Sequence, residues 1–180
     1  MGNKQLTRIG ICTALICVAS YISFPLPWTP AMVTAQTLVI NIIALVLRPK
    51  EAFLSMVLYI GMGVMGLPIF AGGMSGIGKI LGPNGGYYIG FWVASVIMSF
   101  LRGKKISFKR YLLVTVCIGM PIIDVLGALF MSYYQKVSFM EVFIMSVLPF
   151  FIGDLIKCVA ATYVSVMLKR ALPSLREVYN

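Results

Sequence analysis

The chain has 180 residues, of which 60% are hydrophobic and only 11% are charged, and its mean hydropathy is +0.96. Soluble domains contain about 25% charged residues, so this composition excludes an ordinary soluble domain and favours a compact membrane protein. The formal charge of +10 is also typical of proteins that bind nucleic acid. We expect no nucleic-acid partner, because the basic residues lie in short turns between apolar runs, as in the cytoplasmic loops of membrane proteins.

Six apolar segments follow one another along the chain, and its length allows one bundle and no separate soluble domain. We expect helices at about 6–24, 35–47, 52–65, 85–101, 111–131 and 141–170. The predicted fold class is an all-α membrane protein, a single domain over 1–180 with six transmembrane helices in one bundle surrounded by the lipid bilayer.

The basic residues predict which side of the membrane each connection occupies. Of the 15 lysines and arginines, 12 lie at or before the start of the first segment, between the second and third, between the fourth and fifth, or at and after the end of the sixth. They are Lys4, Arg8, Arg48, Lys50, Arg102, Lys104, Lys105, Lys109, Arg110, Lys169, Arg170 and Arg176. Six spans place all four regions on one side, so the N and C termini are predicted to be cytoplasmic.

The two connections expected on the outer side have a different composition. Residues 25–34 are rich in proline, which lacks a backbone donor, so this stretch cannot be a plain helix. Residues 67–86 contain seven glycines. Irregular backbone at membrane depth has to line a cavity or be covered by protein. We therefore expect an outward-facing pocket covered by these two irregular loops.

Charged residues inside the apolar segments are the first candidates for a binding site. Asp154 and Lys157 are three residues apart in the last segment, so a helix places them on one face. Charges within a membrane normally face a partner, a cavity or a ligand. The plainer alternative is that the two charges only neutralise each other so that the helix can insert. Asp124 follows Pro121, and three roles are open for it: bonding backbone groups freed by the proline, pairing with a lysine, or lining the pocket.

Several short motifs together resemble one known family. The chain contains Phe70-Ala71-Gly72-Gly73, then Leu81-Gly82-Pro83-Asn84-Gly85-Gly86-Tyr87, Arg48-Pro49-Lys50, and Gly153-Asp154 with Lys157. With Pro25-Leu26-Pro27 and Val33-Thr34-Ala35-Gln36-Thr37, they resemble the BioY family over nearly the whole chain. Members of that family are the biotin-specific S-components, or substrate-binding subunits, of energy-coupling factor transporters. Asn84, Ala35 and Asp124 depart from the residues usual in the family.

The resemblance implies a function, partners and a location. It implies high-affinity binding and uptake of biotin, which is the transported ligand rather than a cofactor. The implied partners are the transmembrane coupling protein EcfT and two ATPase subunits. The implied location is the bacterial cytoplasmic membrane, which the chain crosses several times.

The resemblance also assigns candidate substrate-binding residues. Asp154, Lys157 and Asn84 are expected at the polar ureido head of biotin, although Lys157 could instead meet its carboxylate. Tyr87, Trp28 and Phe70 are candidates for packing on the ring and tail, with Trp28 alternatively a membrane-interface residue. The remaining candidates are Gln36, Gly86 and Asp124. Simpler structural roles stay open for three of these residues: a turn for Asn84, a helix cap for Gln36 and close helix packing for Gly86.

Enzymatic and metal chemistry are poorly supported by the sequence. It contains no histidine and no phosphate-binding loop of the ATPase type, so we expect no catalytic residues and no metal site. Two rival functions remain to be distinguished. One is a proton-coupled vitamin carrier that acts alone with Asp124 or Asp154 as the proton site, and the other is an intramembrane enzyme that uses Asp154 and Lys157 as acid and base.

Overall fold

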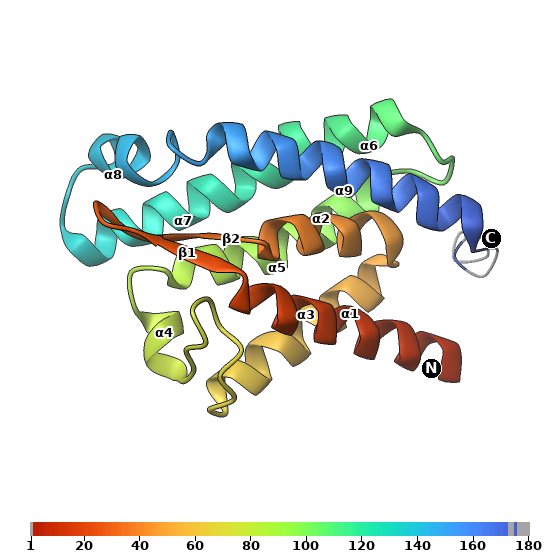
Figure 1. Ribbon diagram of the computed structural model, residues 1–180, viewed down its shortest axis with the longest axis horizontal. Coiled ribbons are helices and arrows are strands. Elements are labelled where there is room, and N and C mark those ends of the chain that lie inside the picture. The colour runs from red at the N-terminus through yellow and green to blue at the C-terminus, as the bar shows by residue number, and fades with distance from the viewer. Residues whose placement is uncertain (1, 173–174, 176–180) are drawn as a thin grey trace.

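The protein is mostly helical in the computed structural model, which describes residues 2–172 and 175 (Figure 1). The helices are α1 (Asn3–Tyr21), α2 (Gln36–Val46), α3 (Pro49–Val64), α4 (Ile77–Leu81), α5 (Gly85–Leu101), α6 (Phe108–Val114), the π-helix η1 (Thr115–Gly119), α7 (Met120–Gln135), α8 (Phe139–Ser146) and α9 (Phe151–Ala171). The strands are β1 (Ser23–Leu26) and β2 (Thr29–Thr34). By length and composition, two helical stretches of the described chain can cross a membrane, Phe108–Gln135 and Phe151–Ala171.

Each of the six expected segments contains a helix, and the segment expected at 85–101 coincides with α5. The prediction of one unbroken helix over 141–170 is wrong, because α8 ends at Ser146 and α9 begins at Phe151. Pro149 lies in the break, where it supplies no backbone N–H to continue the helical hydrogen bonds. The chain therefore starts a new helix three residues before Asp154.

The proline-rich connection forms a β-hairpin rather than an irregular loop. Strands β1 and β2 pair antiparallel, with Ser23 opposite Thr34 and Pro25 opposite Met32. The register shifts between Pro25 and Leu26, where proline contributes no ladder hydrogen bond. The expectation that 25–34 is not helical is confirmed, but its regular pairing was not expected.

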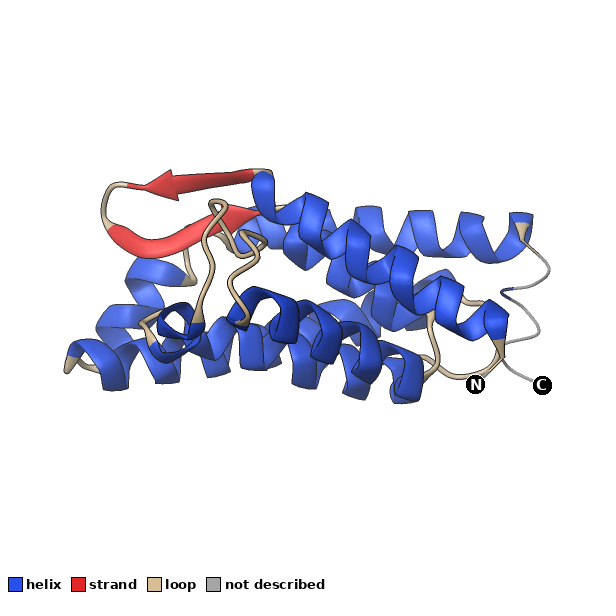
Figure 2. Ribbon diagram, turned by 90° about the horizontal axis from the view of Figure 1, so that it is seen from below, coloured by secondary structure: helices blue, strands red, loops and turns tan. Residues whose placement is uncertain are grey.

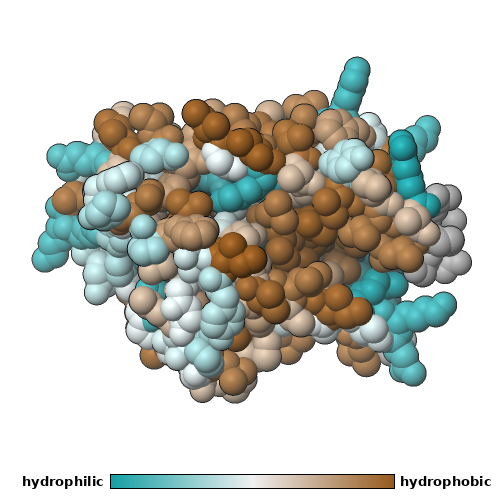
Figure 3. Space-filling model, viewed as in Figure 1, coloured by the Kyte–Doolittle hydropathy of each residue, from teal (hydrophilic) through white to brown (hydrophobic). Residues whose placement is uncertain are grey.

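The connections separate into two ends of an elongated molecule (Figures 1 and 2). The start of α1, the start of α6 and the end of α9 lie at one end, and the hairpin, α4 and α8 lie toward the other. Between the ends the surface is broadly hydrophobic, whereas hydrophilic side chains gather toward both ends (Figure 3). This arrangement matches a molecule with an apolar middle zone and two polar faces.

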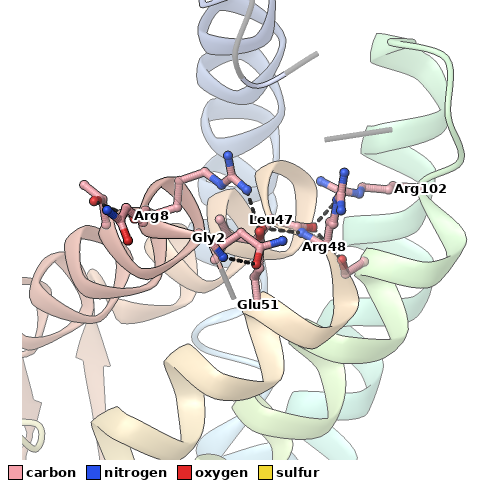
Figure 4. Close-up of polar contacts among 10 residues, drawn as sticks. Gly2, Arg8, Leu47, Arg48, Glu51 and Arg102 are labelled. Atoms are coloured by element: carbon pink, nitrogen blue, oxygen red, sulfur yellow. Dashed lines mark hydrogen bonds and ion pairs between the residues drawn. The ribbon is translucent and has the colours of Figure 1, made fainter. Parts of the chain in front are cut away.

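Three of the basic regions meet at the end that holds the start of α1 (Figure 4). The Arg8 guanidinium pairs with the Glu51 carboxylate at 2.6 Å, and Glu51 also accepts a hydrogen bond from the Arg48 backbone N–H at 3.2 Å. Arg102 is buried and donates to the carbonyls of Leu45 and Leu47. Its guanidinium thus satisfies backbone acceptors near the end of α2 that the helix leaves unpaired.

Helices α5 and α7 approach closely because glycines face the contact. A Cβ added at Gly86 would lie 2.3 Å from the Leu126 carbonyl oxygen, and one added at Gly90 would lie 3.0 Å from the Ile123 Cα. These glycines are four residues apart, so they share one face of α5. Small residues at this spacing let membrane helices pack backbone against backbone.

Substitution of Gly86 by alanine is expected to destabilise the fold. The added methyl group overlaps a backbone oxygen that cannot rotate away, so Gly86→Ala should lower the free energy of unfolding by about 1–3 kcal/mol. Gly61 in α3 is the matched control, since a Cβ there meets nothing within 4 Å, and Gly61→Ala should be neutral or stabilising by up to about 1 kcal/mol. Thermal unfolding in detergent measures both, and equal melting temperatures for Gly86→Ala and the parent protein would contradict the packing argument.

Candidate ligand-binding site

A cavity of about 60 Å³ lies between the hairpin and helices α2, α5, α7, α8 and α9. It brings together residues far apart in sequence, and six of the seven predicted site residues line it. The six are Gln36, Asn84, Tyr87, Asp124, Asp154 and Lys157. Among the described residues that line this cavity, Asp124, Asp154 and Lys157 are the charged ones.

The Asp154 and Lys157 side chains form an ion pair on the face of α9 that borders the cavity. The Lys157 Nζ lies 2.9 Å from Asp154 Oδ1, and the side chains are only 18% and 14% exposed, respectively. The Thr37 hydroxyl of α2 also donates to Asp154 Oδ1, at 3.3 Å. An ammonium group and a carboxylate that are paired and still open to a cavity can each make further hydrogen bonds to a polar ligand.

The break at Pro149 places Asp154 close to the start of a helix. Because α9 begins at Phe151, Asp154 belongs to its first turn. Unpaired backbone N–H groups give a helix N-terminus a partial positive charge, which stabilises a nearby carboxylate. The start of α9 and the Lys157 ammonium therefore both place positive charge beside the Asp154 carboxylate.

Asn84 connects the glycine-rich segment to the hairpin. It is the N-cap residue of α5, but its side chain makes no capping hydrogen bond. Instead its Nδ2 donates to the Pro30 carbonyl at 2.9 Å. Its Oδ1 is buried with no hydrogen-bond partner among the described residues. The turn position expected for Asn84 is present, and the side chain additionally presents a free acceptor beside the cavity.

Gln36 and Tyr87 are fixed by hydrogen bonds on the cavity wall. The Gln36 side chain is 1% exposed, and its Nε2 donates to the Tyr59 hydroxyl at 2.5 Å. It makes no side-chain cap at the start of α2, where Ala35 is the N-cap residue. The Tyr87 hydroxyl donates to the Ser146 carbonyl at 3.4 Å, which joins α5 to the end of α8.

Asp124 lines the cavity from α7, across from the α9 pair. No hydrogen bond or close ion pair to Asp124 is found among the described residues. Of its three possible roles, the structure therefore supports a place in the cavity wall. The helix continues through Pro121 because the π-helix η1 precedes it, and π-helical insertions are frequent at functional sites.

Three candidates lie outside the cavity. Gly86 packs against Leu126 and Phe130 of α7, so its role is close helix packing. Phe70 is fully buried and stacks near the rings of Tyr59 and Tyr88. Trp28 is 56% exposed in the turn between β1 and β2. None of the three lines the cavity, and the interface position expected as an alternative for Trp28 agrees with its exposure.

The sequence reasoning missed several wall residues. Thr37, Tyr88, Phe91, Ser146 and Phe150 all line the cavity. Thr37 and Tyr88 are the immediate sequence neighbours of the predicted site residues Gln36 and Tyr87. Including the neighbours of each predicted residue would have found them. Ser146 and Phe150 flank the break at Pro149, which was not anticipated.

Comparisons with known proteins identify the fold and the family of the chain. The structure superimposes with a TM-score of 0.87 on a crystal structure described as the S-component for biotin from an ECF-type ABC transporter, at 27% sequence identity, covering 94% of this chain and 95% of that one. Two relatives are each 36% identical. The probable biotin transporter BioY of Pyrococcus horikoshii matches over 92% of this chain and 96% of its own length. The biotin transporter BioY of Thermotoga maritima matches over 93% of this chain and 96% of its own length.

The fold is thus that of an S-component, a membrane subunit of an energy-coupling factor transporter. The BioY family model matches residues 1–174. The chain belongs to the BioY family, as the motifs of the glycine-rich segment and the last helix indicate.

The Asn84 side chain should hold β2 in place. Asn84→Ala removes the side-chain donor to the Pro30 carbonyl, and the loss of one hydrogen bond costs about 0.5–1.5 kcal/mol. Amide hydrogen exchange in residues 29–34 should therefore become about 3- to 10-fold faster. Tyr21→Phe is the control, because it removes a bond to the Pro68 carbonyl at 2.6 Å that does not involve β2. Hydrogen-exchange mass spectrometry gives the answer, and unchanged exchange in 29–34 of Asn84→Ala would show that this contact does not anchor the hairpin.

Proposed function

We propose that this chain binds biotin in the cavity between the hairpin and α9 and serves as the substrate-binding subunit of a biotin uptake transporter. The observation that carries the proposal is the Asp154–Lys157 ion pair, whose two side chains are mostly buried and line the cavity. The names of the relatives and of the structural neighbour support the choice of ligand.

The polar groups of the wall complement the ureido head of biotin. That head presents two N–H donors and one carbonyl acceptor. Asp154 and the free Oδ1 of Asn84 are acceptors suited to the N–H groups, and the Lys157 ammonium is a donor suited to the carbonyl. An alternative pose places Lys157 against the biotin carboxylate. The apolar walls formed by Phe91, Ile123 and Phe150 suit the fused ring and the aliphatic tail.

The hairpin and the glycine-rich segment have to move for the ligand to enter. The cavity of about 60 Å³ is well below the 300–1,000 Å³ typical of small-molecule pockets. Ala31, Met32 and Val33 of β2 and Ala71 of the glycine-rich segment form part of the wall. Outward displacement of these two segments enlarges the cavity without repacking of the helices.

The proposed setting is the bacterial cytoplasmic membrane, crossed several times, with both termini in the cytoplasm. The gathering of Arg8, Arg48 and Arg102 at the end opposite the hairpin supports this orientation (Figure 4). The proposed partners are the transmembrane coupling protein EcfT and two ATPase subunits, which supply the energy for uptake. The rival proton-coupled carrier requires instead that this chain alone accumulate biotin in ATPase-free liposomes under a proton gradient.

Substitutions at the ion pair should weaken binding strongly. Asp154→Asn and Lys157→Ala each leave the other charge unpaired and remove a ligand contact, so each should weaken biotin binding by about 30- to 1,000-fold, equivalent to about 2–4 kcal/mol. Ile156→Ala is the control, because Ile156 lies between them on the chain and is 64% exposed. Equilibrium titration of the purified proteins measures these affinities, and tight binding by both variants would refute the site.

The double variant Asp154→Asn/Lys157→Met separates binding from mere charge neutralisation. It removes both charges and leaves neither unpaired, so it should fold, as checked by size-exclusion chromatography and thermal unfolding. If the pair served insertion alone, this variant would bind biotin like the parent. The proposed function requires that it fold and fail to bind.

A further inference from the structure

A second, smaller cavity, called the inner cavity below, adjoins the main one. Its volume is about 10 Å³, enough for a single water-sized particle. It is lined by Thr37, Asn41, Met120, Ile123, Asp124, Asp154 and Cys158. Thr37, Ile123, Asp124 and Asp154 also line the main cavity, so the two cavities share a polar wall.

Asn41, which lines this inner cavity, carries a side-chain oxygen without a hydrogen-bond partner among the described residues. Its side chain is only 3% exposed, and its Nδ2 donates to the Cys158 Sγ at 3.5 Å. Its Oδ1 is buried and has no hydrogen-bond partner within the described part of the chain. Buried amide oxygens are rarely left unpaired, so this oxygen indicates that something binds there.

The other unused polar atoms around the inner cavity are also oxygen acceptors. Asp124 makes no hydrogen bond to any described residue. Asp154 receives both of its side-chain hydrogen bonds, from Lys157 and Thr37, at Oδ1, which leaves Oδ2 available. The Thr37 hydroxyl has two acceptors for its single hydrogen, Asp154 Oδ1 at 3.3 Å and the Thr34 carbonyl at 3.5 Å, so only its lone pairs can serve another group.

The charge of the wall points in the same direction. The described titratable residues that line the two cavities are Asp124, Asp154 and Lys157, and their formal charges sum to one negative charge in excess. A neutral water molecule leaves that charge in place, whereas a small cation with oxygen ligands removes it. A divalent cation such as calcium would leave one positive charge in excess instead, whereas a monovalent cation balances the wall.

We propose that the inner cavity is a binding site for one Na⁺ ion, held by Asp124, Asp154, the Asn41 Oδ1 and the Thr37 hydroxyl. The bound ion neutralises the excess carboxylate beside the ligand cavity. It therefore favours an anionic ligand such as a carboxylate-bearing vitamin. By linkage, a ligand that binds more tightly with Na⁺ present also tightens the binding of Na⁺.

Thermal unfolding of the ligand-free protein tests the site without biotin. NaCl is titrated against N-methyl-D-glucamine chloride at constant pH and ionic strength. Na⁺ should raise the melting temperature by about 2–4 °C at a concentration about fivefold above its dissociation constant, and further with the logarithm of the concentration above that. Because no biotin is present, failure of this test is distinct from failure of the proposed function.

Matched variants assign the effect to the inner cavity. Asp124→Asn and Asn41→Leu should each abolish the Na⁺-dependent shift. Thr162→Val should retain it, since Thr162 has a buried hydroxyl without a partner but lines neither cavity. In the parent protein, replacement of Na⁺ should also weaken biotin binding several-fold.

Three results would overturn the proposal. The first is a melting temperature of the parent protein that does not depend on Na⁺. The second is a Na⁺-dependent increase in melting temperature that persists in both Asp124→Asn and Asn41→Leu. The third is a melting temperature that changes with pH but not with Na⁺, which would mean that protonation of Asp124 removes the excess charge. If one of the two variants fails to fold, the Na⁺ titration of the parent protein and the other variant still test the proposal.

Discussion

A carboxylate and an ammonium group among apolar helices have to be partnered, and the polar architecture of this protein depends on that requirement. Asp154 meets it through Lys157 on its own helix, the Thr37 hydroxyl of α2 and the first turn of α9. The break at Pro149 creates that first turn in the middle of an apolar stretch. Discontinuous helices whose N-termini face polar groups are a recurring way to build binding sites within membrane proteins.

The cavity is enclosed from the other side by backbone that is not helical. The hairpin supplies part of the wall, and Asn84 ties it to the start of α5 through the Pro30 carbonyl. Gly86 and Gly90 bring α5 close to α7, which places Asp124 across the cavity from the α9 pair. At the far end, Arg102 on the α2 carbonyls and Arg8 on Glu51 hold the helices together.

Much of this arrangement was predictable from the sequence, and the reasons are physical. Hydropathy located α5 at residues 85–101, and the spacing of Asp154 and Lys157 gave their shared face. Proline predicted that 25–34 is not helical, but strand pairing depends on partners that local composition does not reveal. Strong apolar character around Pro149 concealed the break between α8 and α9.

Other features depend on contacts that only the tertiary fold determines. Nothing local to Gly86 distinguishes close packing on α7 from contact with a ligand, and Phe70 is drawn into the core by Tyr59 and Tyr88. Thr37 and Asn41 are ordinary polar residues of a short helix in sequence. They line the cavities because their side chains contact Asp154 and Cys158 of α9, which lie more than 100 residues later in the chain.

The central claim is that the α9 charge pair recognises the polar head of a ligand. The most direct test is an equilibrium titration of the purified protein with biotin and with an analogue in which a methylene group replaces the ureido carbonyl. The account predicts that the analogue binds at least about 100-fold more weakly, because the Lys157 ammonium loses its acceptor. Equal affinity for the two compounds would contradict it.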